Sequence, residues 1–98
     1  MIATFRHDWL RDFFLLDIRN RQIPPDLEKA LFRKLQLIDD ATEGRDLRVP
    51  PGNHFEKLSG NLKAYCSIRV NKQWRLVFTW NADRGEAADL YLDDHSYQ

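Results

Sequence analysis

The sequence predicts an α+β fold, in which two N-terminal helices pack on an antiparallel sheet of four to five strands in the order β-α-α-β-β-β-β. Residues 9–16 and 27–38 repeat apolar side chains at helical spacing. Residues 65–80 alternate apolar and polar side chains with period two, which is typical of strands with one buried face. The 98 residues are 43% hydrophobic, which is enough for a core, so we expect one domain over residues 1–98.

The first half of the chain supplies one short strand and both helices. We expect residues 1–5 to form the strand, and Asp8 to stand at the N-terminal end of the first helix, where a carboxylate is favourable. Pro24-Pro25-Asp26 is a start signal for the second helix, which we expect to end near Asp40. The apolar stripes are Trp9, Leu10, Phe13, Phe14 and Leu16 in the first helix, and Leu27, Ala30, Leu31, Leu35 and Ile38 in the second.

The second half predicts an antiparallel meander. Prolines and glycines mark residues 41–52 as a loop, and residues 53–58 are expected to form a short strand. The central hairpin, residues 65–80, is followed by a connection and a last strand over residues 87–92. A polar tail, residues 93–98, ends the sequence.

The alternation also predicts the register of the central hairpin. Directly opposed residues of an antiparallel pair lie on the same face of the sheet. A three-residue connection at residues 71–73 pairs Arg69 with Arg75, and Ile68 with Leu76, so that each pair shares a face. Two arginines then oppose each other on the polar face. They either bind an anion or remain solvated there.

Composition excludes several function classes. No run of 18 apolar residues and no signal-peptide pattern is present, and the single Cys66 is on the apolar strand face, so we expect a cytosolic protein without a membrane anchor. The three histidines have no metal-ligand spacing, and no phosphate-binding glycine pattern occurs. We therefore expect neither a metal nor another cofactor.

Charge is distributed unevenly along a chain of zero net charge. Residues 47–82 carry six lysines and arginines against Glu56 alone, whereas residues 83–98 carry five acidic residues against Arg84. We expect the central hairpin to form one positive surface that suits a phosphate backbone. The acidic tail is expected to weaken non-specific nucleic-acid binding.

The polar residues around this sheet fit the cleavage of RNA. That reaction needs a base for the 2′-hydroxyl proton, a cation for the phosphate and an acid for the leaving 5′-oxygen. Arg75 suits the second role, and His95 suits the first or the third because histidine titrates near neutrality. His95 is equally compatible with a hydrogen-bonded tail residue.

The sequence resembles the HigB group of plasmid-maintenance killer toxins, which share the RelE/ParE fold. The resemblance is carried by MIATFRHDWLRDFF at the start, by PPGNHFEKLSG, and above all by SIRVNKQWRLVF, residues 67–78. It implies a RelE-like fold and a ribosome-dependent endoribonuclease that needs no metal and cleaves mRNA in the ribosomal A site. It further implies a helix-turn-helix, HigA-like antitoxin, the 70S ribosome and mRNA as partners, and operator DNA only through the antitoxin.

Residue by residue, the resemblance places the transition-state cation at Arg75 and the terminal histidine at His95. Relatives often carry lysine where this chain has Ser59 and tyrosine where it has Asp94. Lys57 or Lys63 is expected to replace the lysine, and Tyr97 the tyrosine. The expected catalytic residues are therefore Arg75, His95 and Lys57, and the expected RNA-binding residues are Arg69, Lys63, Lys72, Tyr65 and Tyr97.

Two other functions are compatible with the sequence. The departures at Ser59 and Asp94 favour a non-enzymatic inhibitor of a protein target, such as the gyrase-directed members of the superfamily. They also fit a catalytically weakened toxin that is kept for binding its antitoxin.

Overall fold

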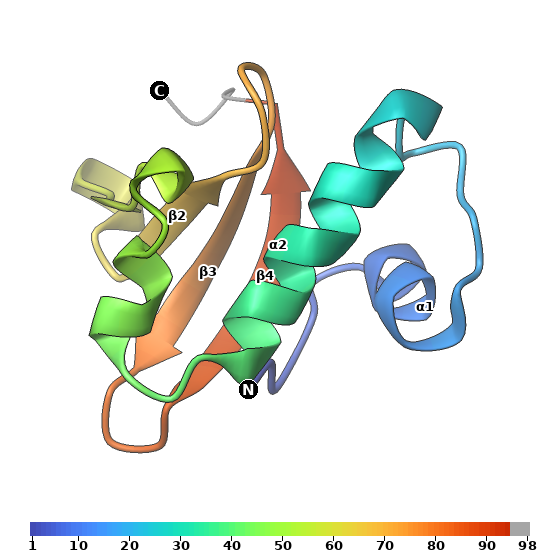
Figure 1. The fold of residues 1–98 in the computed structure, drawn as a ribbon. Coiled ribbons are helices and arrows are strands. Elements are labelled where there is room, and N and C mark those ends of the chain that lie inside the picture. The colour runs from blue at the N-terminus through green and yellow to red at the C-terminus, as the bar shows by residue number, and fades with distance from the viewer. Residues whose placement is uncertain (95–98) are drawn as a thin grey trace.

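The computed structural model describes residues 1–94. Helices α1 (Asp8–Leu16) and α2 (Glu28–Asp40) precede a four-stranded antiparallel sheet (Figure 1). The prediction of two helices on an antiparallel sheet is confirmed. The strands β1 (Glu56–Lys57), β2 (Tyr65–Arg69), β3 (Arg75–Asn81) and β4 (Glu86–Asp93) lie in the sheet in chain order, and the 3-10 turns η1 (Pro25–Leu27), η2 (Gly44–Arg48), η3 (Pro51–Asn53) and η4 (Gly60–Leu62) occupy connections.

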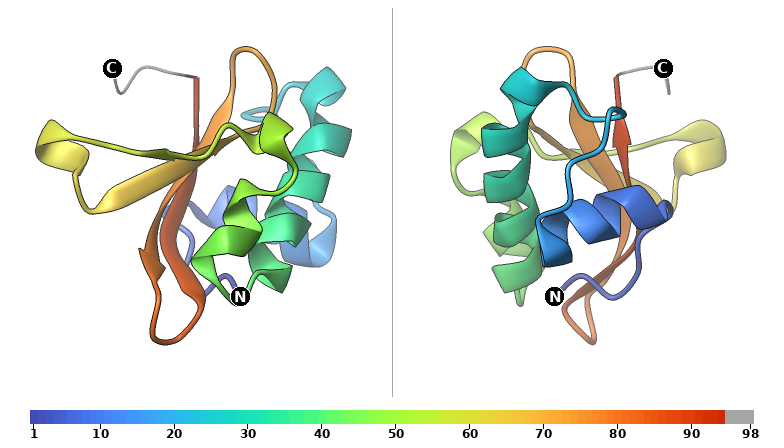
Figure 2. Two further views of the ribbon diagram at one scale, coloured as in Figure 1. Left: turned by 60° about the vertical axis from the view of Figure 1, so that its left-hand side comes forward. Right: turned by 90° about the vertical axis from the view of Figure 1, so that its right-hand side faces the viewer.

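Both helices lie on the same side of the sheet (Figure 2). Leu31 and Leu35 of α2 are fully buried, as are Ile68 of β2 and Phe78 of β3, which alternate onto the side that faces the helices. Each such side chain stabilises the fold by about 1.5–3 kcal/mol. Within residues 1–94 no helix covers the opposite side, which we call the open face. It is the side to which Ser67, Arg69 and Arg75 belong.

The N-terminal segment does not form the predicted strand. It runs beside β4 in parallel and makes two isolated bridges, Ile2 to Ala87 and Phe5 to Leu90. Between them the amide of Asp89 donates to the hydroxyl of Thr4 (2.8 Å). A side chain thus replaces the carbonyl that would continue the ladder, because a bulge in β4 shifts the register there.

Strand β1 is shorter than the predicted residues 53–58. Asn53 ends the turn η3 and is fully buried. Its side-chain amide Nδ2 donates to the carbonyls of Leu47 (3.1 Å) and Val49 (3.2 Å). His54 then adopts a left-handed backbone (φ 45°), which no strand accommodates. Pairing therefore begins only at Glu56.

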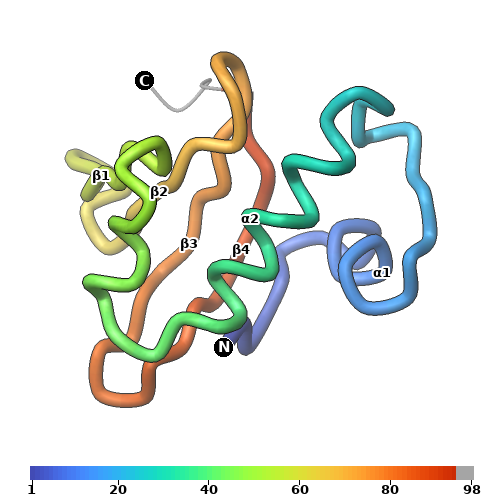
Figure 3. The backbone as a smooth tube through the Cα atoms, viewed as in Figure 1, coloured from blue at the N-terminus to red at the C-terminus, as the bar shows by residue number. Residues whose placement is uncertain are grey.

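The predicted hairpin register is confirmed. Arg69 pairs with Arg75, and Ile68 with Leu76, across a three-residue connection that stands clear of the sheet (Figure 3). The side chain of Asn71 closes this connection by accepting the amides of Gln73 and Trp74, both at 2.8 Å. An Asx-type turn of this kind fixes the two arginines opposite each other.

Within residues 1–94, no helix is long and apolar enough to cross a bilayer. In the same range, no group of three histidine, cysteine or acidic side chains could hold a metal ion.

Candidate functional site

Arg75 begins β3 at the connection end of the open face, and its guanidinium is held by fixed acceptors. Nε donates to the hydroxyl of Ser67 (2.8 Å), and Nη2 donates to the carbonyl oxygens of Ser67 (3.3 Å) and His54. Nη2 also lies 3.3 Å from a carboxylate oxygen of Glu56, which pairs with Ser67 on the same face. These contacts tie the loop before β1 to strands β2 and β3.

The burial of Arg75 argues against the alternative in which both opposed arginines remain solvated. Its side chain is 3% exposed, and Ser67 beneath it is fully buried. A charged group out of water is tolerated only with hydrogen-bond partners, and Arg75 has a hydroxyl, two carbonyls and a carboxylate. The positive charge is therefore fixed in place, and repulsion from Arg69 is balanced by these acceptors.

Arg69 and His54 form the accessible part of this site. Nη1 of Arg69 lies 3.4 Å from Nε2 of the exposed His54 ring, and Nε of Arg69 donates to the carbonyl of Asn71 (3.1 Å). The left-handed backbone of His54 is uncommon for a residue with a Cβ. It directs the carbonyl of His54 to Arg75, while its ring reaches Arg69. A proton-transfer group thus stands beside a cation.

A second cluster occupies the other end of the open face. Arg6 forms a bidentate pair with Asp89 (Nε to Oδ1 3.1 Å, Nη2 to Oδ2 2.7 Å), and the hydroxyl of Tyr65 donates to the same carboxylate. The guanidinium of Arg6 also lies 3.8 Å from the ring centroid of Tyr91. The hydrogen bonds from Arg6, and then from Tyr65, lower the pKa of Asp89 to about 2.

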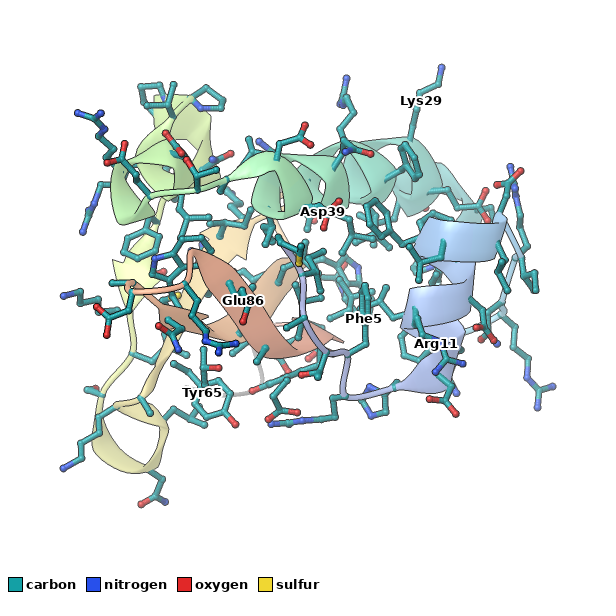
Figure 4. The ribbon with its side chains drawn as sticks, turned by 90° about the horizontal axis from the view of Figure 1, so that it is seen from below. Phe5, Arg11, Lys29, Asp39, Tyr65 and Glu86 are labelled. Atoms are coloured by element: carbon teal, nitrogen blue, oxygen red, sulfur yellow. The ribbon has the colours of Figure 1, made fainter. Side chains whose placement is uncertain are left out.

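This cluster changes the interpretation of Tyr65. The residue was expected to bind RNA, and it does lie on the side of the sheet away from α2 (Figure 4). Its hydroxyl, however, is engaged with Asp89, and that hydrogen bond raises the pKa of Tyr65. Only the ring remains available for contact with another molecule.

The structure does not bring Lys57 or Lys63 to Arg75. Lys57 pairs with Cys66, whose side chain belongs to the helix side of the sheet, so Lys57 lies on the opposite face from Arg75. Lys57 and Lys63 instead line a hollow on that opposite side. Lys72 is exposed in the connection between β2 and β3, near the Arg69 end of the open face.

The expected single positive surface is therefore divided by the sheet. Arg69 and Arg75 lie on the open face, whereas Arg48, Lys57 and Lys63 lie around the hollow behind it. The division follows from strand parity, because neighbouring residues of β1 point to opposite sides. Glu56 accordingly approaches Arg75, while Lys57 points away from it.

Four further residues were considered in the sequence. Cys66 is buried, and loss of hydration raises the pKa of its thiol to about 12, so it is a poor nucleophile. Asp94 is exposed at the end of β4. His95 and Tyr97, which were expected to contribute to catalysis and RNA binding, lie outside the described residues.

The structure also brings into the site residues to which the sequence assigned no role. His54 lies beside Arg69 in the site. The local sequence feature that could have indicated this is the position of His54 after a proline-glycine turn, next to the strand region. Arg6 and Asp89 are separated by 83 residues. No local pattern connects them, so only the fold brings this pair together.

Comparison with known proteins agrees with this architecture. The family model for HigB, described as a RelE-like toxin of a type II toxin-antitoxin system, matches residues 3–95. Toxin HigB-1 of Vibrio cholerae is 55% identical over 97 residues, which covers 99% of this chain and 100% of that protein. A Haemophilus influenzae protein that carries no functional name is 43% identical over 93 residues, with coverage of 95% and 90%.

Among solved structures, the YoeB-YefM complex from Staphylococcus aureus contains a similar chain. The TM-score is 0.51 at 26% identity, and the match covers 92% of this chain and 94% of that one.

Proposed function

The chain belongs to the HigB-like family of RelE-like toxins of type II toxin-antitoxin systems, and on that premise we propose that it arrests translation by cutting mRNA in the ribosomal A site. The observation that carries this proposal for the chain itself is the placement of the exposed His54 ring 3.4 Å from the guanidinium of Arg69, above the buried Arg75. It combines a group that can transfer protons with a cation that can hold a phosphate.

The reaction we propose is transesterification of the RNA backbone. The 2′-oxygen attacks the adjacent phosphorus as its proton passes to a base, and the bond from phosphorus to the 5′-oxygen breaks as that oxygen receives a proton from an acid. The products are a 2′,3′-cyclic phosphate and a 5′-hydroxyl. His54 is proposed for one of the two proton transfers, and His95 remains the candidate for the other because of the family resemblance.

We propose a metal-independent reaction, in which an arginine side chain serves as the cation for the phosphate. We propose that Arg69, whose guanidinium lies 3.4 Å from the exposed His54 ring, contacts the phosphate directly. Arg75 uses Nε and Nη2 on Ser67 and His54, so we propose that it acts as a positioning residue. It holds the carbonyl of His54 and supplies a fixed positive field, which favours the charge that develops on the phosphate.

Variants of His54 and Arg69 test this assignment. His54→Ala is expected to lower the cleavage rate by about 10²–10⁴-fold, and Arg69→Ala by about 10²–10³-fold, because each removes a group that acts in the transition state. The measurement is primer extension on mRNA in a reconstituted translation reaction, with mass spectrometry of the new 3′ ends. Lys29→Ala is a matched control, because Lys29 extends from α2 away from the sheet (Figure 4).

Full cleavage by folded His54→Ala and Arg69→Ala proteins would contradict the proposed site. Growth arrest without any mRNA cut would contradict the nuclease function and favour a non-enzymatic inhibitor. Thermal unfolding of each variant separates loss of chemistry from loss of fold.

We also propose the partners that the family implies. These are a helix-turn-helix, HigA-like antitoxin, the 70S ribosome with its mRNA, and operator DNA that is reached only through the antitoxin. The proposal is supported by the family match and by the similar YoeB chain, which was solved in a complex with YefM.

A further inference from the structure

A hollow of about 520 Å³ lies on the side of the sheet that carries the helices, behind the open face. The turn η2 forms one wall, and β1 with the start of β2 forms the other. Its apolar lining includes Leu47, Phe55 and Trp80. Four basic side chains surround this apolar floor: Arg45, Arg48, Lys57 and Lys63.

The positive charge around the hollow is almost entirely without acidic partners. No acidic residue lines it, and within residues 1–94 the sole ion pair of these four side chains joins Arg45 to Glu43 (2.8 Å), two exposed groups. Arg48 lies over the ring of Phe55, 4.4 Å from its centroid. Unlike Arg75, these cations are not fixed by carbonyls or hydroxyls of the described part of the chain.

One buried polar atom adjoins the hollow. Nε1 of Trp80 is shielded from solvent and has no hydrogen-bond acceptor among residues 1–94. The backbone of η2 approaches it at Gly44, where an added Cβ would lie 3.7 Å from Nε1. A buried donor without an acceptor is uncommon.

The lining favours a peptide over a nucleotide. Arg48 already occupies one face of the Phe55 ring, which leaves less aromatic surface there for a base to stack on. An apolar floor inside a cationic rim instead complements a segment that carries an aliphatic side chain flanked by carboxylates. The volume suits one or two side chains of such a segment.

We propose that this hollow, with Arg45, Arg48, Lys57 and Lys63 at its rim, is the docking site for an acidic segment of the cognate protein antitoxin. An aliphatic side chain of that segment lies against Phe55 and Trp80, and its carboxylates pair with the basic rim. The inference rests on the toxin assignment. It goes beyond that assignment in placing the contact behind the sheet, away from His54 and Arg69.

A charge reversal at the rim tests the proposal. The variant Arg45→Glu with Arg48→Glu is compared with Arg21→Glu with Lys29→Glu, which changes the net charge equally at exposed positions away from the hollow. Affinity for the purified protein encoded beside this chain is measured by calorimetry at two salt concentrations. The rim variant is expected to bind at least about 30-fold more weakly, while the control stays within about threefold of the parent.

Growth arrest is measured in parallel on induction of each variant with and without that neighbouring protein. The rim variant is expected to remain toxic and to escape neutralisation. Unchanged affinity overturns the proposal, and so does loss of toxicity with intact antitoxin binding, which would assign the hollow to RNA. If the parent chain cuts no mRNA, the proposed nuclease function fails, yet the affinity comparison still decides the role of the hollow.

A second pair of variants guards against misfolding. Arg48→Gln removes the charge and keeps much of the contact with Phe55, and Ala64→Trp fills the hollow from an exposed position. Both are expected to weaken antitoxin binding, and a folded Ala64→Trp protein that binds with full affinity would also overturn the proposal.

Discussion

The two sides of the sheet both carry positive charge, but they hold it differently. On the open face, Arg75 is buried and bound to Ser67, His54 and Glu56. In the hollow behind, Lys57 and Lys63 are exposed and make no ion pair within residues 1–94. The first arrangement suits chemistry, because a preorganised cation needs no rearrangement as charge develops on a phosphate.

The second arrangement suits association. Exposed cations attract an acidic partner from a distance and adapt to it on contact, at the cost of strong screening by salt. Strand parity alone separates the two roles. Glu56 and Lys57 are adjacent in the chain, and they serve opposite sides of the sheet.

The largest effect on stability is expected at Arg75. Arg75→Ala leaves the Ser67 hydroxyl and the His54 carbonyl without their donor, so the free energy of unfolding is expected to fall by about 2–4 kcal/mol. Urea unfolding measures this loss. Arg84→Ala is the matched control, because Arg84 is 72% exposed and its change is expected to be below about 0.5 kcal/mol.

Equal stabilities of the Arg75 and Arg84 variants would show that the burial of Arg75 is not what fixes the site. Arg75→Lys provides a finer measurement. Lysine keeps the charge but cannot donate to Ser67 and His54 with the two nitrogens of one planar group. The free energy of unfolding of Arg75→Lys is therefore expected to lie between those of the parent and Arg75→Ala.

A smaller effect is expected at the Arg6 end of the open face, where the pair is only partly buried. Asp89→Asn removes the charge, and asparagine tolerates the left-handed backbone at this position (φ 52°). The free energy of unfolding is expected to fall by about 1 kcal/mol at pH 7. The two side chains are 38% and 39% exposed, so solvent screens much of the attraction.

The pH dependence of this loss follows from the pKa of Asp89. Its value of about 2 in the folded chain lies below the ordinary 3.8, so the stabilisation is present above pH 4 and is lost as the pH falls toward 2. The difference in unfolding free energy between the parent and Asp89→Asn is therefore expected to shrink between pH 5 and pH 2.5. A constant difference across that range would exclude the carboxylate as its source.

Periodicity and strand parity predicted most of the fold. The hairpin register was predictable because a three-residue connection keeps every opposed pair on one face, whereas a two-residue connection would mix the faces. The comparisons bear out the resemblance that residues 67–78 carried most specifically. The second helix was predictable because the spacing of Leu27, Leu31, Leu35 and Ile38 gives one apolar stripe, and all four side chains are buried.

The site was less predictable, because it depends on contacts between distant residues. The face of Lys57 is set by its pairing with Cys66, and a strand of two residues has too little alternation to reveal that face. The burial of Arg75 depends on the loop that ends at His54, which the sequence assigned to a strand. The roles expected of His95 and Tyr97 stay predictions.

The smallest effects distinguish the two sides most directly, at neighbouring positions of β1. Glu56→Ala removes a carboxylate beside Arg75 and is expected to lower the unfolding free energy by about 0.5–1 kcal/mol, because Glu56 is half exposed. Lys57→Ala is expected to change it by less than about 0.5 kcal/mol, and in the stabilising direction at low salt, because it relieves repulsion within the basic rim. Urea unfolding at 20 mM and 1 M sodium chloride measures both. Since salt screens the rim, the change in unfolding free energy caused by Lys57→Ala is expected to vanish at 1 M. If Lys57→Ala lowered the unfolding free energy as much as Glu56→Ala does at both salt concentrations, the hollow would be as rigidly organised as the open face.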